Sequence, residues 1–182
     1  GIFEYLELAN LMKDSDFEFY LAGDLDNGNP NSLSESQLNE IKNSNFINYL
    51  GHIDIKKELH NFDINIVMSK YEGSSRILLE SLYIGLICLS NNIPGTSELS
   101  SKFRNSFFID KNNIEEFRRS LDGIINHDAF SESTQNILFG EDAKYNRKLI
   151  DENYTSIKIA AAYNKIYRYL RKEIESYKSE FN

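Results

Sequence analysis

Two glutamates that stand eight residues apart are the side chains of this sequence whose type and spacing first suggest chemistry. They are Glu72 and Glu80, in "SKYEGSSRILLESLYIG" (69–85), and Gly73, Ser74 and Ser75 directly follow the first of them. The sequence predicts a helix that starts between Gly73 and Ser75. The first amides of a helix have no intrahelical partner, and together with the helix dipole they attract phosphate groups. We therefore expect an anion site at this turn.

The residues around the turn suit the other parts of a nucleoside diphosphate sugar. Gly73 lets a ligand approach the backbone closely, and Ser74 and Ser75 add hydroxyl donors. Carboxylates accept hydrogen bonds from vicinal sugar hydroxyls. In a continuous helix the two acids would lie roughly 12 Å apart, about the distance from one sugar to the other across a diphosphate. This arrangement places the diphosphate at the helix start, the ribose at Glu80 and the transferred sugar at Glu72.

Both glutamates also have a purely structural interpretation. Glu72 would then complement the helix dipole, Glu80 would be a solvated position, and a spacing of eight arises by chance in most proteins. The context favours the ligand site, because the pair follows an apolar run, brackets a glycine and precedes a second apolar run and Pro94-Gly95.

Strand-like and helical runs alternate along the chain. These elements must position Glu72, Glu80 and the turn between them. A capping box, Ser34 with Gln37, and the caps Asp54 and Thr155 mark helix starts. The alternation predicts an α/β fold with a Rossmann-like, doubly wound parallel sheet, whose ligands bind at the carboxyl ends of the strands. We expect strands at 17–24, 45–52, 64–69, 86–91 and 106–110, helices at 2–12, 34–43, 55–62, 74–84, 114–124 and 155–177, a loop at 92–99, and short helices and loops over 128–153.

Composition excludes several classes of protein. The chain has 182 residues, 41% of them hydrophobic, and a net charge of -8, which argues against a nucleic-acid partner. One cysteine, Cys88, cannot form an internal disulfide, and this favours a reducing compartment. No apolar stretch is long enough to span a bilayer. No histidine and cysteine cluster has metal-ligand spacing, so we expect neither a metal nor a cofactor.

The stretch 71–99 resembles the E-x7-E region of retaining glycosyltransferases with the GT-B fold, in the large glycosyltransferase family 4 (glycosyl transferases group 1). The likeness covers nearly the whole chain, as the C-terminal, donor-binding half, and is strongest to the enzymes of bacterial capsule and lipopolysaccharide assembly. The residues that follow the family pattern are Glu72-Gly73, Leu78-Leu79-Glu80, Ile84-Gly85, Pro94-Gly95 and Glu98.

The resemblance implies a role for each candidate residue. Glu72 would hold the hydroxyls of the transferred sugar at the reacting centre, and Glu80 would bind the ribose diol. The diphosphate would lie on the amides of Ser75, Arg76 and Ile77. The base would lie beside the loop of Gly51, His52 and Ile53, although His52 is equally suited to cap a turn. The co-substrate would be a nucleoside diphosphate sugar, with a UDP-sugar as the first expectation, and the acceptor a saccharide or lipid-linked sugar.

The resemblance also implies a domain organisation. Residues 1–153 would form the nucleotide-sugar-binding domain, and 154–182 a helix that crosses back to an N-terminal, acceptor-binding domain. That domain, and the first strand of this half with its phosphate-neutralising Arg and Lys, would precede Gly1. We expect a cytoplasmic protein that also associates with the inner face of the membrane through the preceding half. We expect residues 1–182 alone to bind the donor weakly and to catalyse no turnover. The alternatives are a sugar-nucleotide epimerase of related fold and a non-catalytic donor-binding or scaffold domain.

Overall fold

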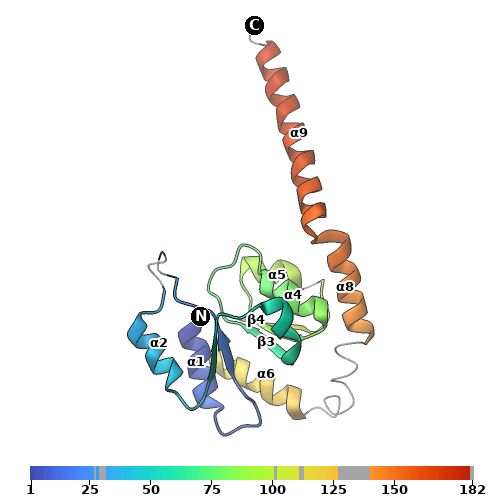
Figure 1. Ribbon diagram of the computed structural model, residues 1–182. Helices are drawn as coiled ribbons and strands as arrows, with labels where there is room; N and C mark the ends of the chain where they lie inside the picture. The colour runs from blue at the N-terminus through green and yellow to red at the C-terminus, as the bar shows by residue number, and fades with distance from the viewer. Residues whose placement is uncertain (27, 29–31, 101, 111–112, 127–139, 181–182) are drawn as a thin grey trace.

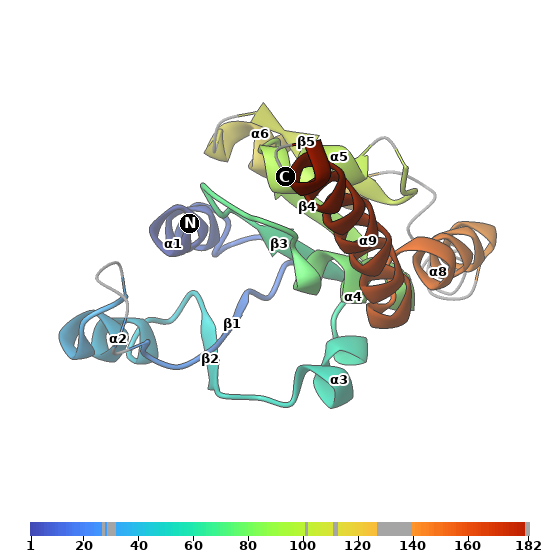
Figure 2. The same ribbon diagram turned by 90° about the horizontal axis from the view of Figure 1, so that it is seen from above.

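Five parallel strands form two separate ladders in the computed structural model, which describes residues 1–26, 28, 32–100, 102–110, 113–126 and 140–180. The first ladder has the order β1-β2 and the second the order β3-β4-β5. Each strand lies within a range predicted from the sequence, and every pairing is parallel, as expected. Figure 2 shows the two ladders apart. The strands are β1 (Tyr20–Ala22), β2 (Asn48–Gly51), β3 (Ile64–Val67), β4 (Ile87–Asn91) and β5 (Ser106–Ile109).

Helices connect the strands and complete the alternating order (Figure 1). The predicted capping box is present, because Ser34 accepts from the Gln37 amide while the Gln37 side chain accepts from the Ser34 amide. The Thr155 hydroxyl accepts from the Lys158 amide at 3.4 Å, as predicted for a cap. The helices are α1 (Ile2–Leu11), α2 (Glu35–Lys42), α3 (Ile55–Glu58) with a 3₁₀ turn (Leu59–Asn61), α4 (Arg76–Ile84), α5 (Pro94–Ser100), α6 (Ile114–Asn126), α8 (Glu141–Asn153) and α9 (Ser156–Glu180).

Two apolar clusters lie on opposite faces of the three-stranded ladder. Leu89 of β4 belongs to the cluster with α1 and α6, whereas Cys88, the next residue toward the N-terminus, belongs to the cluster with α4, α5 and α8. Successive side chains of a strand point to opposite faces, so a strand buried on both faces has no polar side. All five residues of β4 are buried. This two-faced burial is the doubly wound arrangement predicted from the sequence.

Two predictions of irregular structure were wrong. Residues 92–99 were expected to be a loop, but Pro94 begins α5, a position where its missing N–H and fixed φ suit a helix. Residues 141–153 form one helix of 13 residues rather than short pieces. Its polar Asn146 is fully buried, where it accepts from the Arg104 amide at 2.9 Å and donates to the Arg104 carbonyl at 2.8 Å. The rest of the segment expected to be irregular, 128–139, lies outside the described residues.

The long helix α9 extends away from the two ladders (Figure 1). Ile157, Tyr163, Ile166 and Tyr167 are exposed along it. Among the described residues no helix is long and apolar enough to cross a membrane.

Candidate functional site

The start of α4 presents unbonded donors, as the sequence predicts. Ser75 is its N-cap and Arg76 its first residue, so the helix begins at the end of the predicted interval. The bond from the Leu79 amide to the Ser75 carbonyl, 3.2 Å, is the first one along the helix, which leaves the amides of Arg76, Ile77 and Leu78 without an intrahelical acceptor. The Ser75 side chain makes no capping bond. Its hydroxyl is buried, with the residue 1% exposed, and has no hydrogen-bond partner within the described ranges.

The two glutamates lie on different kinds of backbone. Glu80 belongs to α4, but Glu72 lies in the loop before it. The spacing of roughly 12 Å expected for a continuous helix therefore does not apply to this pair, a correction that follows from the cap at Ser75. The Glu80 side chain is 31% exposed, and its Oε1 lies 3.4 Å from Nε of Arg76 one turn earlier. Glu80 thus already has a cationic neighbour at its carboxylate.

The β4–α5 connection supports the loop that carries Glu72. Asn91, which is buried, donates through Nδ2 to the Ser69 carbonyl at 3.0 Å. The hydroxyl of the buried Thr96 donates to the Asn91 carbonyl and accepts from the Ile93 amide at 3.3 Å. Gly95 packs against the Glu72 backbone so closely that a Cβ built on it would lie 1.9 Å from the Glu72 carbonyl oxygen. A side chain at position 95 would therefore displace Glu72 or the turn.

Glycines at the ends of β1 and β2 shape the second loop of the predicted site. Gly51 has φ 65°, and the Gly23 amide donates to its carbonyl at 2.8 Å. The Tyr49 hydroxyl donates to the Gly23 carbonyl at 2.6 Å. His52 is exposed, and its Nδ1 lies 3.6 Å from Oδ2 of Asp24, so imidazole and carboxylate connect the two strand ends.

Three basic side chains near the predicted site, Arg76, His52 and Lys70, each have an acidic neighbour. Arg76 faces Glu80 and His52 faces Asp24, as described above. Nζ of Lys70 lies 2.6 Å from Oε1 of Glu4 in α1. The hydrogen bond from Lys70 is the main reason why the pKa of Glu4 lies below its ordinary value. A phosphate at α4 would therefore be held chiefly by backbone amides and hydroxyls.

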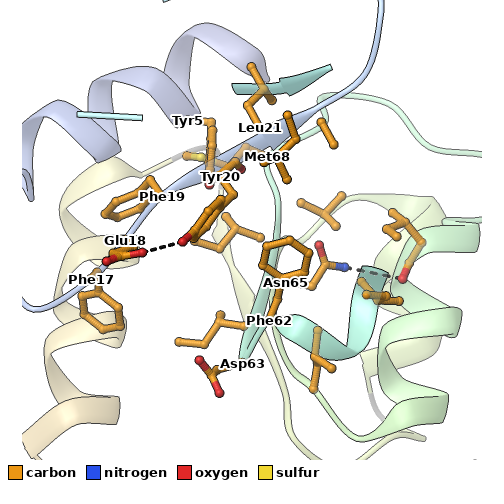
Figure 3. Close-up of a pocket in the computed structure, with 18 of the residues that line it drawn as sticks. Tyr5, Phe17, Glu18, Phe19, Tyr20, Leu21, Phe62, Asp63, Asn65 and Met68 are labelled. Atoms are coloured by element: carbon orange, nitrogen blue, oxygen red, sulfur yellow. Dashed lines mark hydrogen bonds between the residues drawn. The ribbon is translucent and has the colours of Figure 1, made fainter. Parts of the chain in front are cut away.

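A cavity of about 990 Å³ brings three of the predicted residues together. Ile53, Glu72 and Ile77 line it. Residues of α1, β1 and β3 also line it, among them Tyr5, Tyr20 and Asn65 (Figure 3). The other predicted residues do not line this cavity. They are Gly51, His52, Gly73, Ser74, Ser75, Arg76 and Glu80.

Sequence reasoning missed Asn91, Thr96 and the pairing of Arg76 with Glu80. A signal was present for the pair, since residues four apart on a helix face each other. A second signal was the polar Asn91 at the end of a mostly apolar strand, because a buried amide requires partners.

Carboxylates do not cluster into a metal site in the described part of the chain. The sequence contains two Asp-x-Asp triplets, Asp14-Ser15-Asp16 and Asp24-Leu25-Asp26. Neither belongs to a group of three or more acidic, histidine or cysteine side chains that could hold an ion among the described residues.

Comparisons with known proteins agree with the fold. The family model "Glycosyl transferases group 1" matches residues 1–138. An uncharacterized 42.6 kDa protein from the cps region of Klebsiella pneumoniae is 29% identical over 111 residues, which are 60% of this chain and 28% of that protein. The chain therefore spans less than a third of this relative.

Two solved structures show the same architecture. Anabaena Alr3699/HepE in complex with UDP and glucose matches 92% of this chain and 44% of its own, with 16% identity and a TM-score of 0.70. Sucrose-phosphate synthase from Thermosynechococcus elongatus matches 93% and 42%, with 15% identity and a TM-score of 0.69. These similarities confirm the predicted fold, a Rossmann-like half of a GT-B fold.

Proposed function

The chain belongs to the glycosyl transferases group 1 family, and from that premise we propose that it is the donor-binding part of an enzyme that transfers a sugar from a nucleoside diphosphate sugar. The proposed donor is a UDP-sugar. The observation that carries the proposal is the start of α4, where amide donors without intrahelical acceptors meet the buried, unbonded hydroxyl of Ser75 between Glu72 and Glu80. Such a cluster of donors suits a diphosphate.

Each part of the donor has a proposed contact. The amides of Ser75, Arg76 and Ile77 hold the diphosphate, with Gly73 and Ser74 beside it. Glu80 accepts from the ribose hydroxyls on the carboxylate face that Arg76 leaves open. Glu72 accepts from the hydroxyls of the transferred sugar, and Ile53 forms an apolar wall for the base beside Gly51 and His52. Complexes of Alr3699/HepE with UDP and glucose support uridine as the first base to test.

The proposed reaction retains the anomeric configuration of the donor. The helix start stabilises the charge that develops on the leaving diphosphate, because its donors are already oriented before the bond breaks. Glu72 positions the sugar ring rather than forming a bond to it. The proposed acceptor is a saccharide or lipid-linked sugar in surface-polysaccharide assembly, at the cytoplasmic face of the membrane, and it would bind between this chain and a further domain that α9 reaches.

Titration of the isotope-labelled 182-residue chain with nucleotides, followed by nuclear magnetic resonance, tests the donor site. UDP is expected to shift the amide signals of Arg76 and Ile77 and to bind with an affinity weaker than micromolar. Comparing the affinities of GDP and ADP with that of UDP shows which base the chain prefers. Glu80→Ala should lower the affinity for UDP and for UDP-glucose by at least about tenfold, because one charge-assisted hydrogen bond is lost. Glu72→Ala should lower the affinity for UDP-glucose alone and change the affinity for UDP by less than about twofold.

The exposed Glu7 of α1 supplies a matched control, because Glu7→Ala removes one acid without touching α4. It should leave both affinities unchanged. The assignment would be refuted if Glu72→Ala and Glu80→Ala lowered the affinity for UDP equally. It would also be refuted if UDP shifted only amide signals outside the start of α4. Turnover by the 182-residue chain alone would refute the need for a second domain.

A further inference from the structure

Arg76 is the first residue of α4, a position where the helix dipole disfavours a positive charge. No acidic residue lies in the first turn of α4 to offset this repulsion, whereas α1, α2, α6 and α8 each carry at least one acid there. The guanidinium therefore lies beside the partial positive charge of the helix start. An anion bound at this helix start would relieve the repulsion between them.

The ion pair of Arg76 with Glu80 holds the guanidinium only loosely. A single nitrogen, Nε, makes the contact, at 3.4 Å, and the Arg76 side chain is 82% exposed. Among the described residues the two terminal nitrogens of Arg76 have no acceptor. A helical pair in which the base precedes the acid by four residues is also the weaker of the two orders.

A pair with the same spacing and order in α6 is held more tightly. Nη1 of Arg118 lies 2.6 Å from Oδ2 of Asp122, and its Nε lies 3.0 Å from Oε2 of Glu115. Two acids therefore hold the Arg118 guanidinium, whereas Arg76 makes one long contact. This comparison shows that the Arg76 guanidinium is available to a further partner.

The side chain of Ser75 independently indicates a ligand at the same helix start. Ser75 is buried, its hydroxyl has no hydrogen-bond partner in the described part of the chain, and it caps none of the α4 amides. A buried polar group without a partner is destabilising, so such groups normally form a hydrogen bond. An anion that accepts from this hydroxyl and from the free amides beside it would satisfy them together.

Glu80 and an anion at the helix start lie in opposite directions from Arg76. The Cα–Cβ bond of a helical residue tilts toward the N-terminus of its helix, and for Arg76 this is the side of the free amides. The contact with Glu80 runs one turn toward the C-terminus instead. Movement of the guanidinium toward a bound anion therefore draws it away from Glu80.

We propose that Arg76 exchanges Glu80 for the diphosphate when the donor binds. This inference rests on the proposed function and adds a side-chain cation to its amide site. The exchange also opens Oε1 of Glu80 to the ribose hydroxyls. In the free chain the pair thus masks one contact to each half of the nucleotide. An intact nucleoside diphosphate is favoured over its separate halves, because one ion pair is broken while two contacts are gained.

Titration of the isotope-labelled 182-residue chain with the two halves of the ligand, followed by nuclear magnetic resonance, tests the exchange. Inorganic diphosphate probes the helix start, and uridine probes Glu80. Arg76→Met should lower the affinity for diphosphate by about tenfold, because a charge-assisted contact is lost, and raise the affinity for uridine by about two- to threefold. Glu80→Ala should raise the affinity for diphosphate by about two- to threefold and lower that for uridine by at least about tenfold.

The double variant separates an exchange from a general effect of charge. Removal of any acid near the site reduces its repulsion of anions, so the gain in Glu80→Ala must depend on Arg76. In the Arg76→Met background, Glu80→Ala should therefore change the affinity for diphosphate by less than about 1.5-fold.

Two further variants control for folding and for the loss of an arginine. Arg76→Lys keeps the charge and should lower the affinity for diphosphate by less than about threefold, so that a larger loss in Arg76→Met reflects the missing cation. Arg118→Met removes an arginine of the same spacing from α6 and should leave both affinities unchanged.

The remaining outcomes also decide the proposal. If UDP shifts the amide signals of Arg76 and Ile77 but Arg76→Met binds diphosphate like the unsubstituted chain, the exchange is wrong and the donor site stands. If neither UDP nor diphosphate shifts these signals, the donor site fails as well. A gain in Glu80→Ala that persists without Arg76 contradicts the exchange, and so does a lower affinity for uridine in Arg76→Met.

Discussion

The amide of the Asn91 side chain donates to the main-chain carbonyl of Ser69 and so ties the end of β4 to the end of β3. Ser69 lies three residues before Glu72, and Gly95, four residues after Asn91, packs on the Glu72 backbone. The position of Glu72 therefore depends on a neighbouring connection as much as on its own loop.

Asn91→Ala should lower the free energy of unfolding by about 1–3 kcal/mol, because it removes the side-chain donor of the half-buried Ser69 carbonyl. Urea unfolding followed by circular dichroism measures the change. The adjacent Asn92 is exposed and bonds to the Asp110 carboxylate at 2.7 Å, so Asn92→Ala is the matched control, with a change of less than about 0.5 kcal/mol. Similar effects of both substitutions would contradict the role of Asn91.

Gly95→Ala should destabilise the chain by about 1–3 kcal/mol, since the new methyl group meets a backbone carbonyl rather than a side chain that can turn away. Gly73, directly after Glu72, is the matched control. A Cβ built on Gly73 would meet no atom within 4 Å, and Gly73→Ala should change stability by less than about 0.5 kcal/mol. Thermal unfolding of both variants measures this difference. A Gly95→Ala chain as stable as the unsubstituted one would show that the turn relaxes freely.

How far the sequence predicts the fold depends on how local the determining signal is. The capping box at Ser34 and the cap at Thr155 were correct because a cap involves residues only three apart. The helix α8 was missed because its buried face carries Asn146, whose partner Arg104 is 42 residues away. Helix α5 was missed because Pro94-Gly95 is also typical of a turn.

The candidate site shows the same limit. The start of α4 was predicted to within three residues, 73 to 75, since glycine and serines before an apolar run mark it directly. The contact of Gly95 with Glu72 was not predictable, because it arises only when α5 packs beside the β3–α4 loop. The division of the sheet was not predicted either, since strand patterns indicate burial but not which edges meet.

Replacing Lys70 should make stability depend less on pH in the acidic range. Because Lys70 lowers the pKa of Glu4 below its ordinary value of 4.5, the pair contributes stability above that pH and loses it as pH falls through the lower, folded value. Lys70→Met should therefore cost about 0.2–1 kcal/mol at pH 7, and the difference from the unsubstituted chain should shrink below pH 4.5. Urea titrations at several pH values measure it. A difference that does not vary with pH would assign the loss to packing.

Gly123 offers a substitution that should stabilise the chain. It lies inside α6, and a Cβ there meets nothing within 4 Å. Gly123→Ala should add about 0.5–1 kcal/mol, because alanine loses less backbone entropy in a helix. Gly85, the C-cap of α4 with φ 100°, is the counterpart, and Gly85→Ala should destabilise. Calorimetric melting of the two variants tests whether backbone conformation, and not glycine itself, determines the sign.

Because Cys88 is buried, the rate at which its thiol reacts reports how often the domain opens. This thiol is the only one in the sequence, it is fully buried in β4, and burial raises its pKa well above the usual range. Thiolate chemistry is therefore suppressed until the strand separates from its neighbours. The rate at which an aromatic disulfide reagent labels the native protein will consequently report how often the centre of the domain opens, without an introduced cysteine.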